Sequence, residues 1–211
     1  MKSKNIGTLW LTLSLGLFAV STGLAQTEKP ASRFSPKGIK VAVGAGSLQP
    51  NSDQALNEGD AGFLSLGYGF TDHISLWLAV VGADHTLKNA ATGQQDKASD
   101  ESTSSFAGIE LNLQHKFATR SRFQPYGKIG VGFYGLEDKL SDETLLGAGL
   151  NLGLGLDFFF AKHFGVGAEF TFKKLNYSHK SMKVAGGDLV SELDRKLDGD
   201  TSGFMITLTI Q

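Results

Sequence analysis

Six charged residues lie within segments that are otherwise built mainly from glycine and apolar residues. They are Glu110, Lys116, Lys128, Asp157, Glu169 and Lys173. Three are acidic and three are lysines, so the set could neutralise itself as ion pairs if folding brought its members together. Charges removed from water are tolerated when they are paired. We therefore expect a structural ion-pair network or, if the pairs exchange partners, a gate for small ions.

Two other patterns could carry chemistry. His179 and Ser181 are a base and a hydroxyl two residues apart, which places both on one face of a strand. Nucleophilic catalysis needs such a pair and a third group that orients the base, but no carboxylate is obviously placed for that role. Asp198 and Asp200 flank Gly199 in a turn-like sequence that is more often solvated than calcium-bound. We expect no catalytic residues, no metal and no cofactor.

The clearest structural signal is the segment from Gly147 to Phe172. From Leu150 onward its even positions are apolar and its odd positions are glycine, polar or charged, apart from a break over 159–163. A period of two is typical of β-strands, because successive side chains point to opposite faces. The segment therefore predicts an antiparallel hairpin with one bulky apolar face and one small, polar face.

The same alternation recurs along the chain and predicts eight strands in total. Besides the two strands of that hairpin, they cover 38–47, 62–70, a strand from Ile74, 106–117, 123–135 and 204–210. The connections alternate between long and short, and the long ones cover 48–60, 83–105, 136–145 and 178–202. Within the last, Leu189, Val190, Leu193 and Leu197 recur at helical spacing after Asp188. This spacing predicts a short amphipathic helix over 187–197.

The N-terminus has the pattern of an export signal. Lys2 and Lys4 precede an apolar run over 9–20, and small residues follow, which predicts a secretory signal peptide over 1–25. We expect a polar leader over 26–37 and a single domain over 38–211. The chain has no cysteine, and without the signal it has 18 basic and 21 acidic residues. This balance argues against a nucleic-acid partner.

Size decides which face of an eight-stranded barrel meets water. Its interior has little more room than packed side chains need, so the glycine-rich face must be inside and the apolar face outside. A lipocalin-like soluble barrel would have the opposite arrangement. Eight phenylalanines also fall in two bands, as in the aromatic girdles of membrane barrels. They are Phe70, Phe117, Phe123, Phe158 and Phe164 near the short turns, and Phe133, Phe172 and Phe204 towards the long connections.

Two stretches, 67–76 and 153–167, together with the closing alternation over 204–210, resemble the small outer-membrane β-barrel family of Gram-negative bacteria, the OmpA- and OmpX-like barrels. The resemblance implies an all-β fold, an eight-stranded antiparallel up-and-down transmembrane β-barrel. It also implies location in the outer membrane with the N-terminus in the periplasm. Its implied partners are outer-membrane lipid, lipopolysaccharide and the barrel assembly machinery. Family members usually end on an aromatic residue, whereas this chain ends with Ile210 and Gln211.

We expect a non-enzymatic barrel with a structural role, whose loops 83–105 and 178–202 could contact an extracellular partner. A narrow porin-like channel for ions or small solutes is the alternative. A third hypothesis is a lipid A-modifying enzyme, because His179 and Ser181 are similar to the His-x-Ser pair of barrel lipid A deacylases. The Asn and Gly expected after that serine are replaced by Met182 and Lys183, which argues against this hypothesis.

Overall fold

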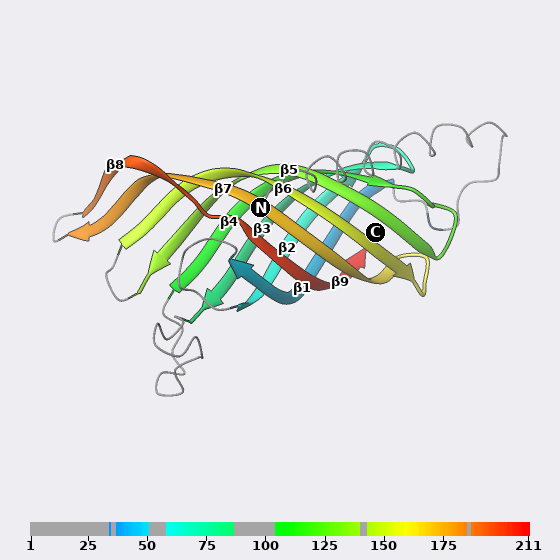
Figure 1. Ribbon diagram of the computed structural model, residues 1–211. Helices are drawn as coiled ribbons and strands as arrows, with labels where there is room; N and C mark the ends of the chain where they lie inside the picture. Colours follow the sequence, from blue (N-terminus) through cyan, green and yellow to red (C-terminus); the bar gives the residue numbers. More distant parts are fainter. Residues whose placement is uncertain (1–33, 35–36, 51–57, 87–103, 140–142, 185–186) are drawn as a thin grey trace, which may run out of the picture. The chain divides into compact units, whose positions relative to one another are not determined.

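The computed structural model describes residues 34, 37–50, 58–86, 104–139, 143–184 and 187–211, which form nine β-strands in one sheet (Figure 1). The strands are β1 (Gly38–Pro50), β2 (Gly59–Gly69), β3 (Ile74–His85), β4 (Ser104–Lys116), β5 (Phe123–Asp138), β6 (Glu143–Phe159), β7 (Phe164–Val184), β8 (Gly187–Asp198) and β9 (Thr201–Ile210). The predicted signal peptide lies outside the described residues. No helix within the described ranges is long and apolar enough to cross a membrane.

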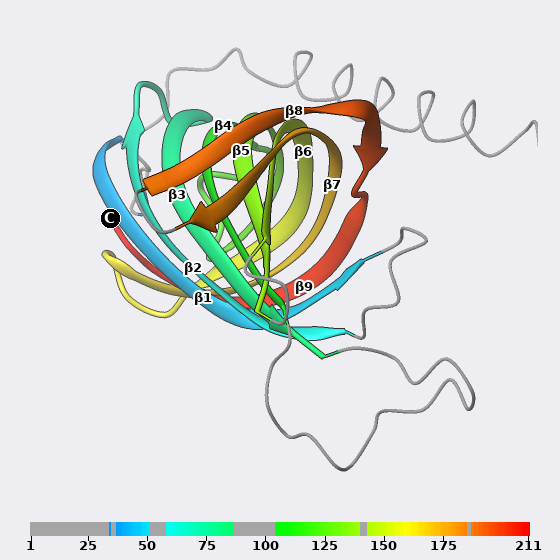
Figure 2. The same ribbon diagram turned by 90° about the vertical axis from the view of Figure 1, so that its left-hand side faces the viewer.

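Eight of these strands close into a barrel. The sheet order is β6-β5-β4-β3-β2-β1-β9-β7-β8, and an additional pairing of β6 with β7 joins the two sides of the sheet. Every pairing is antiparallel, including that of β1 with β9. Figure 2 shows the strands curving around a common lumen. The predicted eight-stranded antiparallel barrel is confirmed.

The barrel is apolar outside and polar inside. Side chains at alternate strand positions are exposed, and they include Leu64, Leu150 and Phe133 at 57%, 57% and 75% exposure. Their neighbours in sequence are buried and are mainly small, polar or charged, as for Ser65 and Asn151. This is the reverse of a soluble barrel, which hides its apolar side chains in the interior. The predicted orientation of the two faces is therefore confirmed.

Short turns join β2 to β3, β4 to β5, and β6 to β7, and all three lie at the same end of the barrel. In the first, the hydroxyl of Thr71 accepts hydrogen bonds from the backbone N–H groups of His73 at 3.1 Å and Ile74 at 2.9 Å. A threonine that satisfies the backbone two and three residues on stabilises a tight turn. The sequence placed this turn correctly at 71–73.

The predicted helix over 187–197 is wrong, because this segment forms strand β8. It pairs with the far end of β7, from Val184 opposite Gly187 to Asn176 opposite Asp198. The pairing register shifts between Tyr177 and His179, where β8 has several extra residues. That irregularity interrupts the period of two, so the apolar residues of β8 fall at spacings that imitate a helix.

The strands are also longer than the sequence predicted. β7 has 21 residues, and its end forms with β8 a hairpin that extends beyond the other strands (Figure 1). Much of the predicted loop 178–202 is therefore strand. The other long connections shorten in the same way, with β1 reaching Pro50, β3 reaching His85, and β5 reaching Asp138. Backbone pairing extends these strands past the point where the apolar alternation ends.

Candidate functional site in the barrel lumen

The candidate site is the lumen, because the alternation that sends apolar side chains outward sends the other side chains inward. The six charged residues singled out from the sequence come from four consecutive strands of the sheet. They are Glu110 and Lys116 on β4, Lys128 on β5, Asp157 on β6, and Glu169 and Lys173 on β7. All except Lys128 are at most 5% exposed. The structure therefore brings all six into one interior.

Glu110 is the acceptor of the first polar cluster. Its Oε1 atom forms an ion pair with Lys173 Nζ and accepts a hydrogen bond from the Tyr134 hydroxyl at 3.2 Å. Its Oε2 atom accepts a hydrogen bond from the Asn112 amide at 3.2 Å. The Asn151 amide donates to the Tyr134 hydroxyl at 3.4 Å. Both carboxylate oxygens thus have partners, which a buried charge requires.

Glu169 is the acceptor of the second cluster. Lys128 Nζ lies 2.5 Å from its Oε1 atom, and the Tyr126 hydroxyl donates to its Oε2 atom at 2.8 Å. Lys128 and Glu169 lie on β5 and β7, so their contact passes over β6. Gly153 on β6 makes this passage available, since a Cβ atom there would lie 3.0 Å from Lys128 Cε and 3.3 Å from Glu169 Oε1. The glycine-rich pattern of β6 therefore provides room for the charges.

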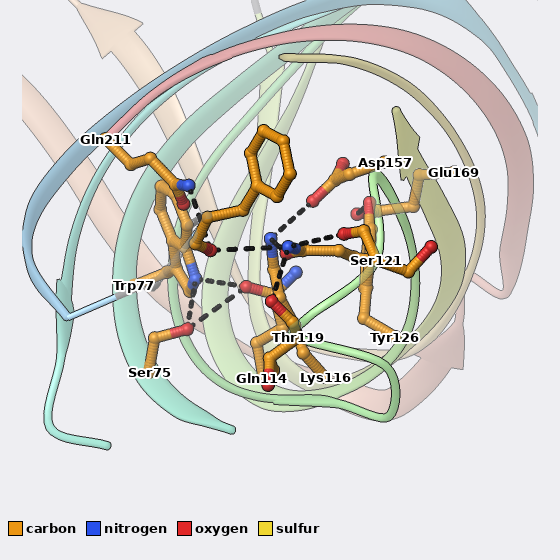
Figure 3. A network of polar contacts seen from close by, with 12 residues as sticks. Ser75, Trp77, Gln114, Lys116, Thr119, Ser121, Tyr126, Asp157, Glu169 and Gln211 are labelled. Carbon is orange, nitrogen blue, oxygen red and sulfur yellow. Dashed lines mark hydrogen bonds and ion pairs between the residues drawn. The ribbon is translucent and has the colours of Figure 1, made fainter. Parts of the chain in front are cut away.

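Lys116 and Asp157 form the third ion pair, with a distance of 2.8 Å between Nζ and Oδ2 (Figure 3). Lys116 also donates to the Gln124 side-chain oxygen at 3.0 Å, and its Nζ lies 4.7 Å from the centroid of the Phe159 ring. Both charged side chains are almost fully buried. This pair lies at the end of the lumen that carries the short turns.

Phe34 adds to the same end of the lumen, although it lies in the segment predicted to be a polar leader over 26–37. It is 7% exposed, and its ring centroid lies 6.3 Å from that of Phe159, which is fully buried. Its carbonyl oxygen accepts hydrogen bonds from the side-chain amides of Gln124 at 3.3 Å and Gln211 at 3.4 Å. The single bulky apolar residue in a polar segment was the available signal.

Trp77 on β3 holds polar side chains of β3 and of the adjacent β4 together. Its indole N–H donates to the Gln114 side-chain oxygen at 2.6 Å, and the Ser75 hydroxyl donates to the same oxygen at 3.1 Å (Figure 3). Lys40 Nζ lies 5.6 Å from the Trp77 ring centroid and has no hydrogen-bond partner in the described part of the chain. Lys40 is 1% exposed. Lys40 occupies an inward position of β1, although it is not one of the six charged residues singled out from the sequence.

An apolar plug fills the lumen at the end away from the short turns. The plug consists of Leu48, Phe106, Leu175, Tyr177 and Met205, all at most 3% exposed. Between the plug and the ion pairs is a cavity of about 50 Å³, lined by residues that include Ala79, Glu110, Glu169 and Thr207. A water molecule needs roughly 10–15 Å³ of such volume. The cavity therefore has room for a few water molecules.

The arrangement of strands and lumen agrees with a comparison against protein families. The model of the outer membrane protein beta-barrel domain matches residues 12–208. This chain belongs to that family. Membership in this outer-membrane β-barrel family places the protein in the outer membrane. A search of curated protein sequences finds no match to this chain.

Solved structures of outer-membrane barrels have the same fold as this family member. OprG from Pseudomonas aeruginosa is 17% identical, with a TM-score of 0.58 over 85% of this chain and 98% of OprG. Neisserial surface protein A is 13% identical, with a TM-score of 0.54 over 82% of this chain and 97% of that protein. AlkL, solved in lipid bilayers, is 13% identical, with a TM-score of 0.51 over 89% and 96% of the two chains. At these identities the likeness concerns the fold alone.

The eight phenylalanines predicted to form girdles of this outer-membrane barrel all lie at outward-facing positions. The exposed ones include Phe133 at 75%, Phe70 at 57% and Phe123 at 56%. The rings of Phe123 and Phe158, on neighbouring strands, have centroids 4.8 Å apart. Their position at membrane interfaces stays a prediction.

The two weaker chemical patterns do not form built sites in this barrel. His179 Nδ1 lies 2.8 Å from the hydroxyl of its neighbour Ser178, and not of Ser181. Lys180, between His179 and Ser181, forms an ion pair with Glu143 at 2.5 Å. Among the described residues, no group of three or more His, Cys, Asp or Glu side chains could hold a metal ion.

Proposed function

We propose that this outer-membrane barrel has a structural, non-enzymatic role and that its lumen is closed to solutes. The observation that carries the proposal is the set of three ion pairs that join non-neighbouring strands inside the lumen. Each pair occupies space through which a solute would have to pass. The apolar plug adds a second barrier at the other end. Together these features support a barrel that contributes stiffness and surface to the membrane without a pore for nutrients.

We further propose that the short turns face the periplasm and that the β7–β8 hairpin projects outside the cell. Long extracellular and short periplasmic connections are the rule for such barrels. The hairpin has exposed apolar residues, Leu189 at 64% and Val190 at 60%, next to exposed charged residues such as Arg195 and Lys196. A mixed surface of this kind suits contact with an extracellular partner.

Liposome swelling tests the closed lumen. The full chain, refolded into vesicles that contain a trapped polymer, is diluted into solutions of small sugars, with an open porin as positive control. A closed lumen gives no swelling above that of protein-free vesicles. Swelling with sugars as large as a disaccharide would contradict the proposal.

A narrow channel for ions is the second candidate function. It is favoured by the cavity of about 50 Å³ and by the ammonium group of Lys40, which has no hydrogen-bond partner among the described residues. If the ion pairs separate, this water-sized space would open into a path along which ions can pass. Ion conductance without sugar permeation is the result that this candidate predicts.

Unchanged lipid A mass after expression of the protein would dismiss the lipid A-modifying hypothesis.

A further inference from the structure

Two of the short turns have an unusual composition. Residues 117–123 read Phe-Ala-Thr-Arg-Ser-Arg-Phe, and residues 158–164 read Phe-Phe-Phe-Ala-Lys-His-Phe. Each turn has basic residues at its tip and phenylalanine on both sides, and neither contains an acidic residue. The third short turn differs, because it carries Asp72, which lies 3.9 Å from Lys37.

The two basic turns lie side by side. They flank the paired strands β5 and β6, where Phe123 is opposite Phe158. The backbone N–H of Phe159 donates to the carbonyl oxygen of Arg122 at 2.8 Å, which ties one turn to the other. The two turns therefore form one continuous surface, which carries the basic residues and phenylalanines of both.

This surface, which we name the basic rim, consists of Arg120, Arg122 and Lys162 together with the outward rings of Phe123 and Phe160. All three basic side chains are exposed, and none has an acidic partner among the described residues. Phe123 is 56% and Phe160 52% exposed. The two rings pack against neighbouring phenylalanines, Phe123 against Phe158 and Phe160 against Phe164, so the three cations are the part of the rim with charge left for a ligand.

The chemistry of the basic rim fits a phosphate group at a membrane surface. Exposed aromatic rings at the end of an outward apolar band lie at the height of the lipid headgroups. A guanidinium group binds phosphate oxygens through two parallel hydrogen bonds, and lysine contributes a point charge. The phenylalanine rings would set how deep this end of the barrel sits in the membrane, and the three cations lie just beyond the rings. This arrangement matches a lipid headgroup with a net negative charge on its phosphate.

We propose that the basic rim binds the phosphate headgroups of anionic glycerophospholipids in the periplasmic leaflet. This inference rests on the proposed orientation, in which the short turns face the periplasm. Bound anionic lipid would surround β5 and β6, the strands that carry Lys128 and Asp157 on their inner face. The rim would thereby select the lipids in contact with this side of the barrel.

Native mass spectrometry of the full chain in detergent micelles tests the proposal, with phosphatidylglycerol and phosphatidylcholine as the two probes. The unmodified protein is expected to bind phosphatidylglycerol more tightly than phosphatidylcholine. The triple variant Arg120→Gln, Arg122→Gln, Lys162→Gln loses roughly fivefold in phosphatidylglycerol affinity per charge, or roughly 100-fold in total. Its affinity for phosphatidylcholine stays the same.

The matched control removes three lysines at the opposite end of the barrel, as Lys139→Gln, Lys180→Gln, Lys196→Gln. It has the same net charge as the triple variant of the rim, and its phosphatidylglycerol affinity is expected to stay unchanged. Equal binding of the two lipids by the unmodified protein, or an equal loss in the control, would overturn the proposal. Both variants are first checked for the heat-modifiable gel mobility of a closed barrel.

A separate measurement tests the orientation. Because the chain has no cysteine, Ser121→Cys introduces a single thiol in the first basic turn. A maleimide that does not cross membranes is expected to label it only after the cells are lysed. Labelling of intact cells would refute the proposed orientation, and with it the periplasmic leaflet as the source of lipid. The lipid preference measured in micelles would be unaffected, so the two failures are distinguishable.

Discussion

Lys173 on β7 and Glu110 on β4 form a buried ion pair although strands β5 and β6 lie between them in the sheet. Their side chains are 4% and 2% exposed, and 63 residues separate them along the chain. The contact therefore crosses part of the lumen and does not follow the wall. The pairs of Lys128 with Glu169 and of Lys116 with Asp157 each pass over one strand in the same way. The side chains of these three ion pairs thus fill the part of the interior that is bounded by β4 to β7.

Breaking the first pair on one side should be costly. Glu110→Leu leaves the Lys173 ammonium buried without its carboxylate and should lower the free energy of unfolding by about 3–5 kcal/mol. The double variant Glu110→Leu, Lys173→Met should recover most of that loss, because no unpaired charge remains. Urea titration of the barrel folded in phospholipid vesicles measures both. Losses that simply add in the double variant would show that the two residues do not depend on each other.

Two lysines at the same end of the lumen should respond in opposite ways to the same substitution. Lys116→Met leaves Asp157 without its ion-pair partner and should cost about 3 kcal/mol. Lys40→Met removes an ammonium that has no hydrogen-bond partner within the described ranges, and should leave stability unchanged or raise it by about 1 kcal/mol. The same urea titration compares them. A loss at Lys40 equal to that at Lys116 would mean that Lys40 has a stabilising role in the lumen.

Gly67 should tolerate no side chain. A Cβ atom there would lie 2.5 Å from the Trp77 ring, which its hydrogen bond to Gln114 holds in place. Gly67→Ala should therefore displace the indole and cost about 1–3 kcal/mol through overpacking. Gly82→Ala is the control, since the nearest atom to a Cβ there would be at 3.7 Å, an ordinary van der Waals distance. Trp77 fluorescence should shift in the first variant only, and an unchanged spectrum in both would contradict the packing described.

The β7–β8 hairpin should be dispensable for the barrel. Tyr177 pairs with Leu197, so an Asn-Gly turn in place of 178–196 can join them as a short hairpin. The pairing of β7 with β9 ends at Lys173 and Thr201, and it is untouched. The shortened chain should retain heat-modifiable gel mobility. Loss of that mobility would show that the hairpin is part of the closed structure.

The sequence predicted the barrel well because its signal is simple. Strict alternation over glycine-rich segments indicates where a strand lies and which way each side chain points. Glu110, Lys128 and Lys173 could therefore be placed inside from their positions in the alternation alone. Their partners could not be derived in the same way. Pairing across the lumen depends on the closing contact between β6 and β7, and on Gly153 leaving room above the intervening strand.

The errors have physical causes as well. The spacing of Leu193 and Leu197 imitates a helix because an irregular register interrupts β8, and only the pairing with β7 decides the conformation. Phe34 lies outside any periodic segment, so its apolar side chain in a polar stretch hinted at burial but did not indicate that the ring packs against Phe159. The position of Lys40 on the inner face of β1 follows from the alternation, but its lack of a hydrogen-bond partner among the residues that the structure describes is a property of the folded lumen.

Recording ion currents through the full chain in a planar lipid bilayer is the most direct test of the closed lumen. Paired charges and the apolar plug predict that the unmodified protein shows no stable conductance. Glu110→Ala, which frees Lys173, should produce brief openings of ion size. A large and steady conductance in the unmodified protein, unchanged by Glu110→Ala, would contradict the claim that the ion pairs close the barrel.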